Sequence, residues 1–298
     1  MKVSCIILNY NDARTTERLV STIKDYKELD SIVIVDNHST DDSVHRLKRL
    51  TGDTIHLIVS GRNGGYGYGN NLGIRYADEK LHATHVLIAN PDVDFSQSCV
   101  RTLKKSFHTC NCLGVTGAVP VSRAGKRGLS SWKLHGFFGD LMDTGLITRR
   151  LLKPWLKDHP EARAIYKGTG ERKERFALVD AIPGSLFLAD INAMRDCGLF
   201  DERVFLYYEE KILGFQMKKN GYQTLLHLDQ TYLHLHSVSI DKSVTTILKK
   251  QAILHKSKLY YYRNYLKINR VQEWIAKGFF QLLMFEIWLL TEVAGISW

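Results

Sequence analysis

Residues 86–94 read Val-Leu-Ile-Ala-Asn-Pro-Asp-Val-Asp, an apolar run that ends abruptly in an amide, a proline and two carboxylates. The apolar run predicts a buried strand, and Pro91 would end it because proline has no amide hydrogen to donate. Asn90, Asp92 and Asp94 would then follow the carboxyl end of the strand, where open α/β sheets bind ligands. Oxygen ligands of this kind suit a divalent cation that bridges a diphosphate. The alternative is a polar turn after a strand, and this stretch alone does not choose between the two.

Strand and helix patterns alternate on both sides of this stretch. Apolar runs typical of strands lie at 3–8, 31–35, 54–60, 86–89, 178–182 and 185–189, and helical spacing is found at 12–24, 39–50, 70–78 and 192–197. Strands that alternate with helices imply a parallel sheet with right-handed crossovers. We therefore expect an α/β fold with a mostly parallel, Rossmann-like central sheet flanked by helices.

A chain of 298 residues is long enough for one large α/β domain with appendages or for two small domains. Its formal net charge of +10 suits nucleic acid, nucleotide-phosphate substrates or an anionic membrane surface, and does not choose among them. The five cysteines are scattered, and Cys110 and Cys112 are too close for a Cys-x-x-Cys pair. We expect reduced thiols in a cytosolic protein, and no secretory signal because a strand-like run starts at Val3.

A polar motif follows the second predicted strand. Residues 33–41 read Val-Ile-Val-Asp-Asn-His-Ser-Thr-Asp, which places Asp36 at the end of the strand. An acid in that place can accept a hydrogen bond from a base N–H or a ribose hydroxyl. The alternative role, a helix cap, fits Ser39 or Asp41 better than Asp36.

A glycine-rich motif follows the third predicted strand. Residues 63–73 read Asn-Gly-Gly-Tyr-Gly-Tyr-Gly-Asn-Asn-Leu-Gly. Glycines let the backbone come close to a ligand and offer N–H groups to it, and the helix N-terminus that follows favours anions. The spacing matches neither the Gly-x-Gly-x-x-Gly of dinucleotide enzymes nor a P-loop. The alternative interpretation is a flexible loop.

A pair of acids, Glu209 and Glu210, begins a predicted helix that ends at the Lys-Lys-Asn-Gly of 218–221. A carboxylate that faces a cleft there could act as the general base for a hydroxyl group. First-turn acids also complement the helix dipole, however. We favour the dipole role for Glu209 and the catalytic role for Glu210.

Two histidines, His234 and His236, lie in a strand-like segment at 232–239. Because they are two residues apart, they would point to the same face of the strand, and one of them could complete a metal site. A lone histidine in this position would more often be structural.

Two later regions are basic. Residues 122–175 form an irregular excursion on the ligand side of the sheet, and residues 241–270 combine lysines and arginines with four tyrosines before an apolar run at 278–290. For the apolar run, we favour a helix that lies in the membrane interface, with the basic residues and tyrosines at the level of the lipid headgroups. A helix packed on the catalytic domain or on a partner chain is the next interpretation. A transmembrane helix is the least favoured one, because the run is shorter than a full span.

The motifs occur in one order: Ile-Leu-Asn-Tyr-Asn at 7–11, Val-Asp-Asn at 35–37, the glycine motif, Asn-Pro-Asp at 90–92, Phe-Asp-Glu at 200–202, Tyr-Glu-Glu at 208–210 and His-x-x-Ser-x-Ser at 234–239. This ordered set, which covers roughly residues 1–265, resembles the family 2 inverting glycosyltransferases with the GT-A fold. The resemblance is strongest to the rhamnosyltransferase-like branch that builds bacterial surface polysaccharides. It implies a catalytic domain at 1–240, with a nucleotide-sugar half at about 1–100 and an acceptor half at about 101–240. A helical, membrane-associating region would follow at 241–298.

The resemblance also assigns the donor and metal sites residue by residue. The base, the ribose and the wall of the nucleotide site would be formed by Asn9, Asn11, Asp36, Asn63, Gly65, Gly67 and Asn71. Asn90 and Asp92 fall on the Asp-x-Asp motif of the family, so that Asp92 would be the main ligand of Mg²⁺ or Mn²⁺ and Asp94 would lie outside the motif. His234 matches the late histidine of the family, and His236 is the alternative.

For the reaction itself, Glu210 matches the second acid of the family's Glu-Asp pair and would deprotonate the acceptor hydroxyl. Ile212 departs from the pattern, since the family normally has another acid there. The corner at Gly184 and Ser185, together with the 122–175 excursion, would shape the acceptor side.

The branch resemblance favours dTDP-rhamnose as the donor, with a UDP-hexose or UDP-galactofuranose next. The acceptor would be a saccharide or a lipid-linked saccharide, and the protein would work at the cytoplasmic face of the membrane. The C-terminal helices could also hold an oligomer together. An inactive scaffold and a nucleic-acid-binding protein are less favoured function classes, the second because no nucleic-acid-reading motif occurs.

Overall fold

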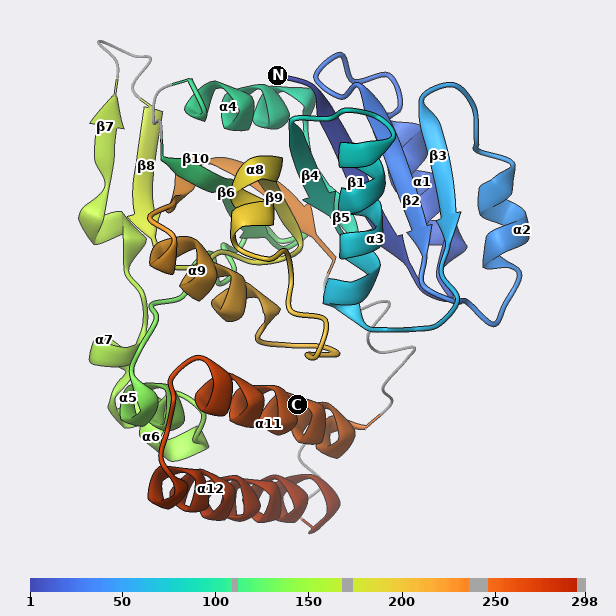
Figure 1. Ribbon diagram of the computed structural model, residues 1–298. Helices are drawn as coiled ribbons and strands as arrows, with labels where there is room; N and C mark the ends of the chain where they lie inside the picture. Colours follow the sequence, from blue (N-terminus) through green and yellow to red (C-terminus); the bar gives the residue numbers. More distant parts are fainter. Residues whose placement is uncertain (109–111, 168–173, 236–245, 294–298) are drawn as a thin grey trace.

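The computed structural model describes residues 1–108, 112–167, 174–235 and 246–293. Within these ranges the strands form one sheet in the order β3-β2-β1-β4-β9-β6-β10-β8-β7, and β5 pairs with the end of β10 (Figure 1). The strands are β1 (Val3–Asn9), β2 (Ser31–Asp36), β3 (Ile55–Val59), β4 (His85–Ala89), β5 (Val93–Asp94), β6 (Leu113–Val121), β7 (Ile165–Lys167), β8 (Glu174–Val179), β9 (Leu186–Asp190) and β10 (Gln223–His234).

The pairing of the strands changes along the sheet. β1 is parallel to β2 and β4, and β2 is parallel to β3. β9 then lies antiparallel between β4 and β6, while β10 is parallel to β6. The predicted α/β class is confirmed, with a sheet that is parallel in its first half and mixed beyond it. Because β1, β2 and β4 are parallel, the polar motifs that follow them meet at the carboxyl ends of these three strands. This part of the sheet is hereafter called the strand edge.

Helices cover both faces of the sheet. One face is covered by α1 (Ala13–Ile23), α2 (Ser43–Lys48) and α4 (Gln97–Ser106), and the other by α3 (Tyr66–Glu79), α8 (Ile191–Asp196) and α9 (Glu209–Lys219). Successive residues of a strand point to opposite faces, so Ile6 packs in the cluster with Ile74 of α3 while Ile7 packs with Leu19 of α1. The apolar runs of the sequence are therefore buried on both sides.

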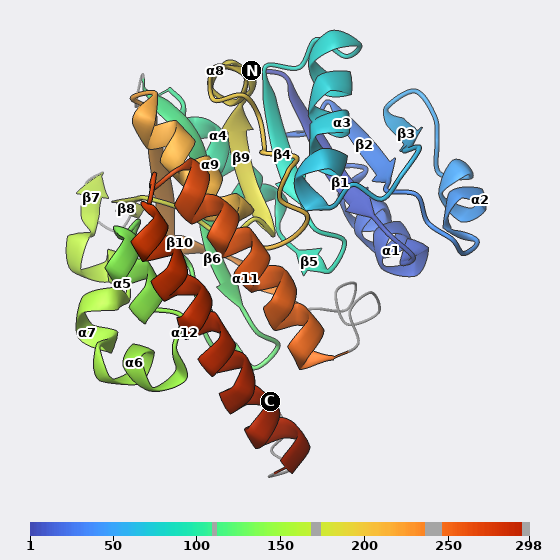
Figure 2. The ribbon, with the colours of Figure 1, turned by 60° about the horizontal axis from the view of Figure 1, so that its bottom comes forward.

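A third cluster lies beyond the sheet and joins three helices that are distant in sequence (Figures 1 and 2). They are α5 (Phe137–Met142), α11 (Ile247–Asn264) and α12 (Arg270–Trp288); nearby elements are α6 (Leu146–Leu151), α7 (Lys153–Leu156), η1 (Pro160–Arg163) and η2 (Leu289–Val293). Tyr261 and Tyr262 of α11 are buried with Phe137 of α5 and with Ile212 of α9. The predicted C-terminal helical extension is thus confirmed, and it packs on α9.

The last helix has a buried face and an exposed one. Its buried residues are Ala276, Phe280, Leu283 and Ile287, at helical spacing. Its exposed side chains include Trp274 and Phe285. Among the described helices, the stretch Arg270–Glu292 passes a test of length and hydropathy for a membrane span, but such a test is also passed by helices that pack on soluble domains.

Three predicted elements differ from the structure by more than one residue at an end. The helix expected at 70–78 starts at Tyr66, because its glycines pack closely on neighbouring segments. The helix expected at 39–50 spans Ser43–Lys48, since Ser39 instead donates hydrogen bonds to Asp36. The strand expected at 178–182 ends at Val179. The chain then turns through Pro183, which lacks an amide donor.

Candidate active site

The carboxyl ends of β1 and β2 are tied together by side chains. Asn9 and Asp36 are register partners and are both fully buried. Asn9 Nδ2 donates to Asp36 Oδ2 at 2.8 Å, and the N–H and Oγ of Ser39 donate to the same carboxylate at 2.9 and 2.6 Å. The carboxylate of Asp36 therefore holds the loop after β2 by accepting hydrogen bonds from neutral groups. Direct contact of Asp36 with a base or a ribose stays a prediction.

Asn11 fixes the loop after β1 to the loop after β2. Its backbone has φ 51°, and its amide Oδ1 accepts from the N–H of Thr40 at 2.8 Å. Its own N–H donates to Ser39 Oγ at 2.9 Å. The structure thus brings Asn9, Asn11 and Asp36 to one place, as the nucleotide assignment requires.

The glycine motif acts by close packing. Gly65 has φ 89°, and a Cβ there would lie 2.1 Å from the carbonyl oxygen of Phe205. A Cβ on Gly67 would lie 3.0 Å from Cβ of Phe200, and its helix continues against β1 in the same way. The N–H of Gly65 donates to Asn63 Oδ1 at 3.1 Å. Since this amide is satisfied within the protein, the donor-binding role of Gly65 and Gly67 stays a prediction.

Asn71 holds the loop that leads to Glu210. Its Nδ2 donates to the carbonyl oxygen of Phe200 and to Glu202 Oε1, both at 2.9 Å, and its Oδ1 accepts from the N–H of Phe200 at 3.1 Å. The buried amide is thus fully engaged by the 200–202 segment. The structure assigns Asn71 a positioning contact, and its place in the nucleotide wall stays a prediction.

The predicted metal pair is brought together by the pairing of β5 with β10. His234 is the register partner of Val93, and its Nε2 lies 3.6 Å from Asp92 Oδ1. Asp92 is buried, whereas Asp94 is exposed. His236 lies outside the described residues.

A carboxylate and an imidazole at this distance fit a divalent ion such as Mn²⁺. The described residues contain no group of three or more His, Cys, Asp or Glu side chains that could hold an ion by themselves. Asp92 and His234 would therefore form half of a site, and its remaining ligands would be waters or phosphate oxygens.

The expected corner at Gly184 and Ser185 lies between Asn90, which precedes the metal pair in the sequence, and Glu210. The N–H of Asn90 donates to the carbonyl oxygen of Ser185 at 2.9 Å. The N–H of Gly184 lies 3.4 Å from Glu210 Oε1, and the hydroxyl of Tyr66 donates to the carbonyl oxygen of Gly184 at 2.6 Å. Asn90, Ser185, Gly184 and Glu210 are thus linked in a continuous row.

The two acids at the start of α9 differ in their surroundings. Burial raises the pKa of Glu210 above its ordinary value, although its side chain keeps some exposure. Glu209 is more deeply buried, its Oε2 has no hydrogen-bond partner among the described residues, and burial and then Glu210 raise its pKa further. A carboxyl group in that setting is most stable when neutral, so Glu210 is the better candidate for an ionised base.

Sequence reasoning missed the structure that holds α9 in place. Tyr207 and Tyr208, just before the two acids, both have left-handed backbones with φ 67° and 72°. Such strain in non-glycine residues is typical of functional sites. It directs Tyr208 away from the sheet edge, toward Asp140 of α5, whose Oδ1 accepts from its hydroxyl.

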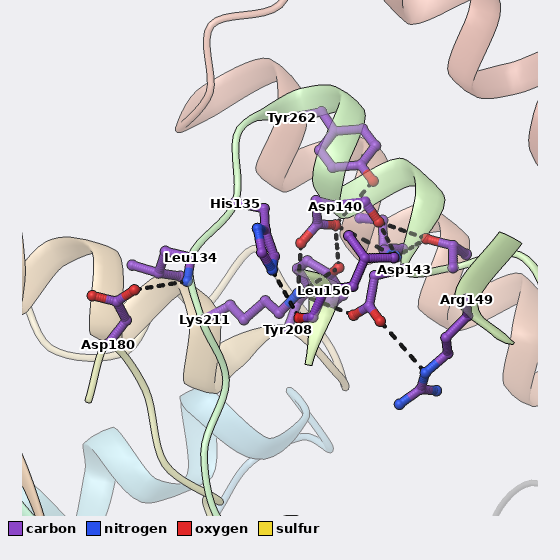
Figure 3. A network of polar contacts seen from close by, with 12 residues as sticks. Leu134, His135, Asp140, Asp143, Arg149, Leu156, Asp180, Tyr208, Lys211 and Tyr262 are labelled. Carbon is purple, nitrogen blue, oxygen red and sulfur yellow. Dashed lines mark hydrogen bonds and ion pairs between the residues drawn. The ribbon is translucent and has the colours of Figure 1, made fainter. Parts of the chain in front are cut away.

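Asp140 is the centre of a buried polar network, hereafter the joint, formed by Asp140, Tyr208, Lys211, Lys258 and Tyr262. Figure 3 labels Asp140, Tyr208, Lys211 and Tyr262 of this network. Lys211 Nζ donates to Asp140 Oδ2 at 2.5 Å, Tyr262 OH donates to Oδ1 at 2.9 Å, and Lys258 Nζ lies 3.5 Å from Oδ1. Burial alone would raise the pKa of Asp140, but Lys258 and Lys211 hold it well below its ordinary value. Burial lowers the pKa of Lys258 to about 8.

The joint also explains the departure at Ile212. This side chain is 1% exposed and packs with Val204, Tyr208 and Tyr261. An acid here would be buried among apolar groups, which is costly. The only signal in the sequence was the replacement of an expected acid by an apolar residue next to Lys211.

Comparison with known proteins gave one family match and one curated relative with partial coverage. A family model described as Glycosyl transferase family 2 matches residues 4–167. The low-salt glycan biosynthesis hexosyltransferase Agl10 of Haloferax volcanii is 38% identical over 109 residues. These residues are 37% of this chain and 34% of that protein, so the match spans about a third of the length of the curated relative.

Several solved structures share the fold. A mannosyltransferase from Pyrobaculum calidifontis in complex with GDP-Man and Mn²⁺ has a TM-score of 0.58 at 13% identity, over 100% of this chain and 76% of the other. GalNAc-T7 with UDP, GalNAc and Mn²⁺ has a TM-score of 0.59 at 14% identity, over 98% and 57%. TarS 1-349 of S. aureus has a TM-score of 0.54 at 14% identity, over 95% and 81%. At these identities the likeness concerns the fold alone.

Proposed function

Since this chain belongs to glycosyl transferase family 2 and has the GT-A fold, we propose that it transfers a sugar from a nucleoside-diphosphate donor to an acceptor hydroxyl with inversion at the anomeric carbon. One observation carries the proposal. Asn90, two residues before the Asp92 of the Asp92–His234 pair, and Glu210 are hydrogen-bonded to adjacent residues of one corner, Ser185 and Gly184. A diphosphate held by Asp92 and His234 would leave its sugar facing Glu210.

On the donor side, Asp92 and His234 would hold the divalent ion, with Asn90 beside them. When bound, the ion would neutralise the charge of the departing diphosphate. Asn9, Asn11 and Asp36 would frame the base and the ribose at the adjacent strand ends. Mn²⁺ accompanies the nucleotide in two of the structures that share the fold, which supports a divalent cofactor.

On the acceptor side, Glu210 would take the proton of the acceptor hydroxyl as its oxygen bonds to the anomeric carbon. The bond between that carbon and the diphosphate oxygen breaks in the same step, and the electron pair leaves with the nucleoside diphosphate. Burial of Glu210 supports this role, because a raised pKa makes its carboxylate a stronger base.

For the donor, dTDP-rhamnose is proposed from the ordered motifs that resemble the rhamnosyltransferase branch. A UDP-hexose or UDP-galactofuranose is the second candidate, and the name of the relative from Haloferax volcanii, a hexosyltransferase, is compatible with each of these donors. A thermal-shift screen of the purified protein distinguishes the candidate donors. It measures the unfolding temperature with dTDP-rhamnose, UDP-glucose, UDP-galactofuranose or GDP-mannose, each with Mg²⁺ or Mn²⁺. Stabilisation by one donor, enhanced by the metal, identifies the substrate.

For the acceptor, we propose a lipid-linked saccharide at the cytoplasmic face of a membrane. The exposed side of α12 carries Trp274, Leu282, Phe285 and Trp288. Apolar and tryptophan side chains of this kind enter the headgroup region of a bilayer. Flotation of the protein with anionic vesicles tests this part, and failure to float would contradict it.

Glu210→Gln tests the chemistry. The variant should bind the donor like the wild type and lose transfer by about 10²- to 10⁴-fold, the usual contribution of a general base. Glu79→Gln, at an exposed site on α3, is the matched control. Normal turnover by Glu210→Gln would remove the base assignment.

A further inference from the structure

A basic cavity lies in the excursion, apart from the strand edge. Its volume is about 410 Å³, within the usual range for ligand sites. Six basic side chains are among the described residues that line it: Arg127, Lys133, Arg149, Arg150, Lys153 and Lys157. The acids of its lining are Asp143 and Asp158.

The cations of the cavity are only partly neutralised. Arg127 pairs with Glu161 at 2.5 Å, and Arg149 lies 3.4 Å from Asp143. Asp158 is already engaged by Ser131 and Arg163. Lys133, Arg150, Lys153 and Lys157 have no acidic partner within 4.0 Å in the part of the chain that the structure describes. Uncompensated cations around one cavity favour an anion with several oxygens.

The cavity opens beside exposed apolar side chains. Trp132 and Leu156 contribute to its wall, while Leu151 at the end of α6 and Trp155 of α7 are each 71% exposed. α6 begins against α12, since a Cβ on Gly145 would lie 2.8 Å from Cζ of Phe279. Figures 1 and 2 both show α5 and α6 next to α12. The short helices that line the cavity thus carry exposed apolar side chains and contact α12 at Phe279.

Two contacts connect the cavity to Glu210. The N–H of Trp132 donates to the carbonyl oxygen of Ala181 at 3.0 Å, at the start of the segment that carries Gly184. Asp143, in the cavity wall, lies 4.0 Å from Nζ of Lys211, the residue after Glu210. The walls of the cavity are therefore tied to the two segments that carry Gly184 and Glu210.

We propose that this cavity binds the phosphate or diphosphate group of a lipid-linked acceptor, an inference that rests on the proposed function. The cations bind the phosphate oxygens, Leu151 and Trp155 contact the start of the lipid chain, and the saccharide extends toward Glu210. The same phosphate chemistry also occurs in anionic phospholipids, so the experiment includes both sources.

The first measurement is calorimetric titration of the full chain with inorganic pyrophosphate in metal-free buffer, which leaves the Asp92–His234 pair without its ion. Arg150→Ala/Lys153→Ala/Lys157→Ala should weaken pyrophosphate binding by about tenfold or more, the loss expected for a single charge-assisted hydrogen bond. Lys48→Ala/Lys105→Ala/Lys219→Ala removes the same charge at exposed sites elsewhere and should bind like the wild type. Equal binding by the wild type and the cavity variant would overturn the proposal.

The second measurement distinguishes the two sources. Phosphatidylcholine vesicles that contain polyprenyl diphosphate should bind the wild type more tightly than vesicles with phosphatidylglycerol at equal charge, and the cavity variant should lose this preference. Equal binding to both vesicles would overturn the acceptor assignment. If the triple variant unfolds, Lys153→Gln/Lys157→Gln, which changes two exposed side chains, replaces it.

Donor binding with Mn²⁺ is measured on the same proteins, and the cavity variant should match the wild type. An absence of donor binding in the wild type would contradict the proposed function, while the pyrophosphate titration still decides whether the cavity is an anion site. The two failures are therefore distinguishable.

Discussion

Asp36 at the strand edge and Asp140 in the joint are almost equally buried, but they are held in different ways. Asp36 is 0% exposed and accepts hydrogen bonds from neutral groups of Asn9 and Ser39. Asp140 is 1% exposed and is surrounded by Lys211 and Lys258, both buried, as well as by tyrosine hydroxyls. The strand edge is thus organised by neutral hydrogen bonds, whereas the joint depends on a balance of buried charges.

This difference gives the two regions different sensitivities. A neutral partner can be lost at the cost of one hydrogen bond, but removal of the anion from the joint leaves two buried ammonium groups with no full counter-charge. The region with the greater effect on stability is therefore the one farther from the predicted donor site. Each of the following predictions tests this contrast.

Asp140→Asn should have the largest effect. It should lower the free energy of unfolding by about 3–5 kcal/mol, because one partner of a buried ion pair is removed. Urea denaturation measures the loss. Asp143→Asn, whose side chain is 21% exposed, is the control and should cost less. Equal costs for the two variants would mean that the charge balance is not centred on Asp140.

Asp36→Asn should have a smaller effect, about 1–3 kcal/mol, because its new amide group faces the donors of Asn9 and Ser39. The same denaturation experiment measures it, with the exposed Asp42→Asn as the control. A loss as large as that of Asp140→Asn would contradict the contrast between the two regions.

Asp92→Ala should affect ligand binding more than folding. Loss of one metal ligand should weaken Mn²⁺-dependent donor binding by at least about tenfold, which is the smallest effect expected even for outer-shell partners. Asp94→Ala, two residues further and exposed, is the matched control. Unchanged donor binding by Asp92→Ala would remove the metal role of this residue.

The smallest effect is the pH dependence caused by Lys258. Its pKa is lowered from 10.5 to about 8, so above pH 8 the unfolded chain binds more protons at this residue than the folded chain does. Stability should therefore rise with pH from about 8 toward 10.5, by about 1 kcal/mol over the first pH unit. Lys258→Met should lack this rise in thermal unfolding at several pH values. An identical pH profile in both proteins would contradict a charged, buried Lys258.

Much of the strand edge could be predicted from the sequence, because its determinants are local. The apolar runs predicted most of β1, β2 and β4. The structure also brings His234 Nε2 to 3.6 Å from Asp92 Oδ1, while the metal role of the two residues stays a prediction. The start of α3 was less predictable. Glycine is a poor helix former, and only the approach of the helix to the 200–205 segment and to β1 explains why it begins at Tyr66.

The joint could not be predicted, since its members are far apart in sequence. Tyr208 and Tyr262 are 68 and 122 residues from Asp140. In the sequence Asp140 and Asp143 are two acids in a basic segment, and the lysines of the joint look like ordinary surface residues. No spacing rule connects them, because their proximity results from the packing of α5, α9 and α11.

The joint draws its residues from three separate stretches of chain, α5, the first turn of α9 and α11. A chimaera that received the C-terminal helices of a relative would import a foreign set of charges at Lys258 without the matching Asp140 and Lys211. These three stretches therefore have to be inherited as a unit. Recombination within the family should favour crossover points that keep all three together.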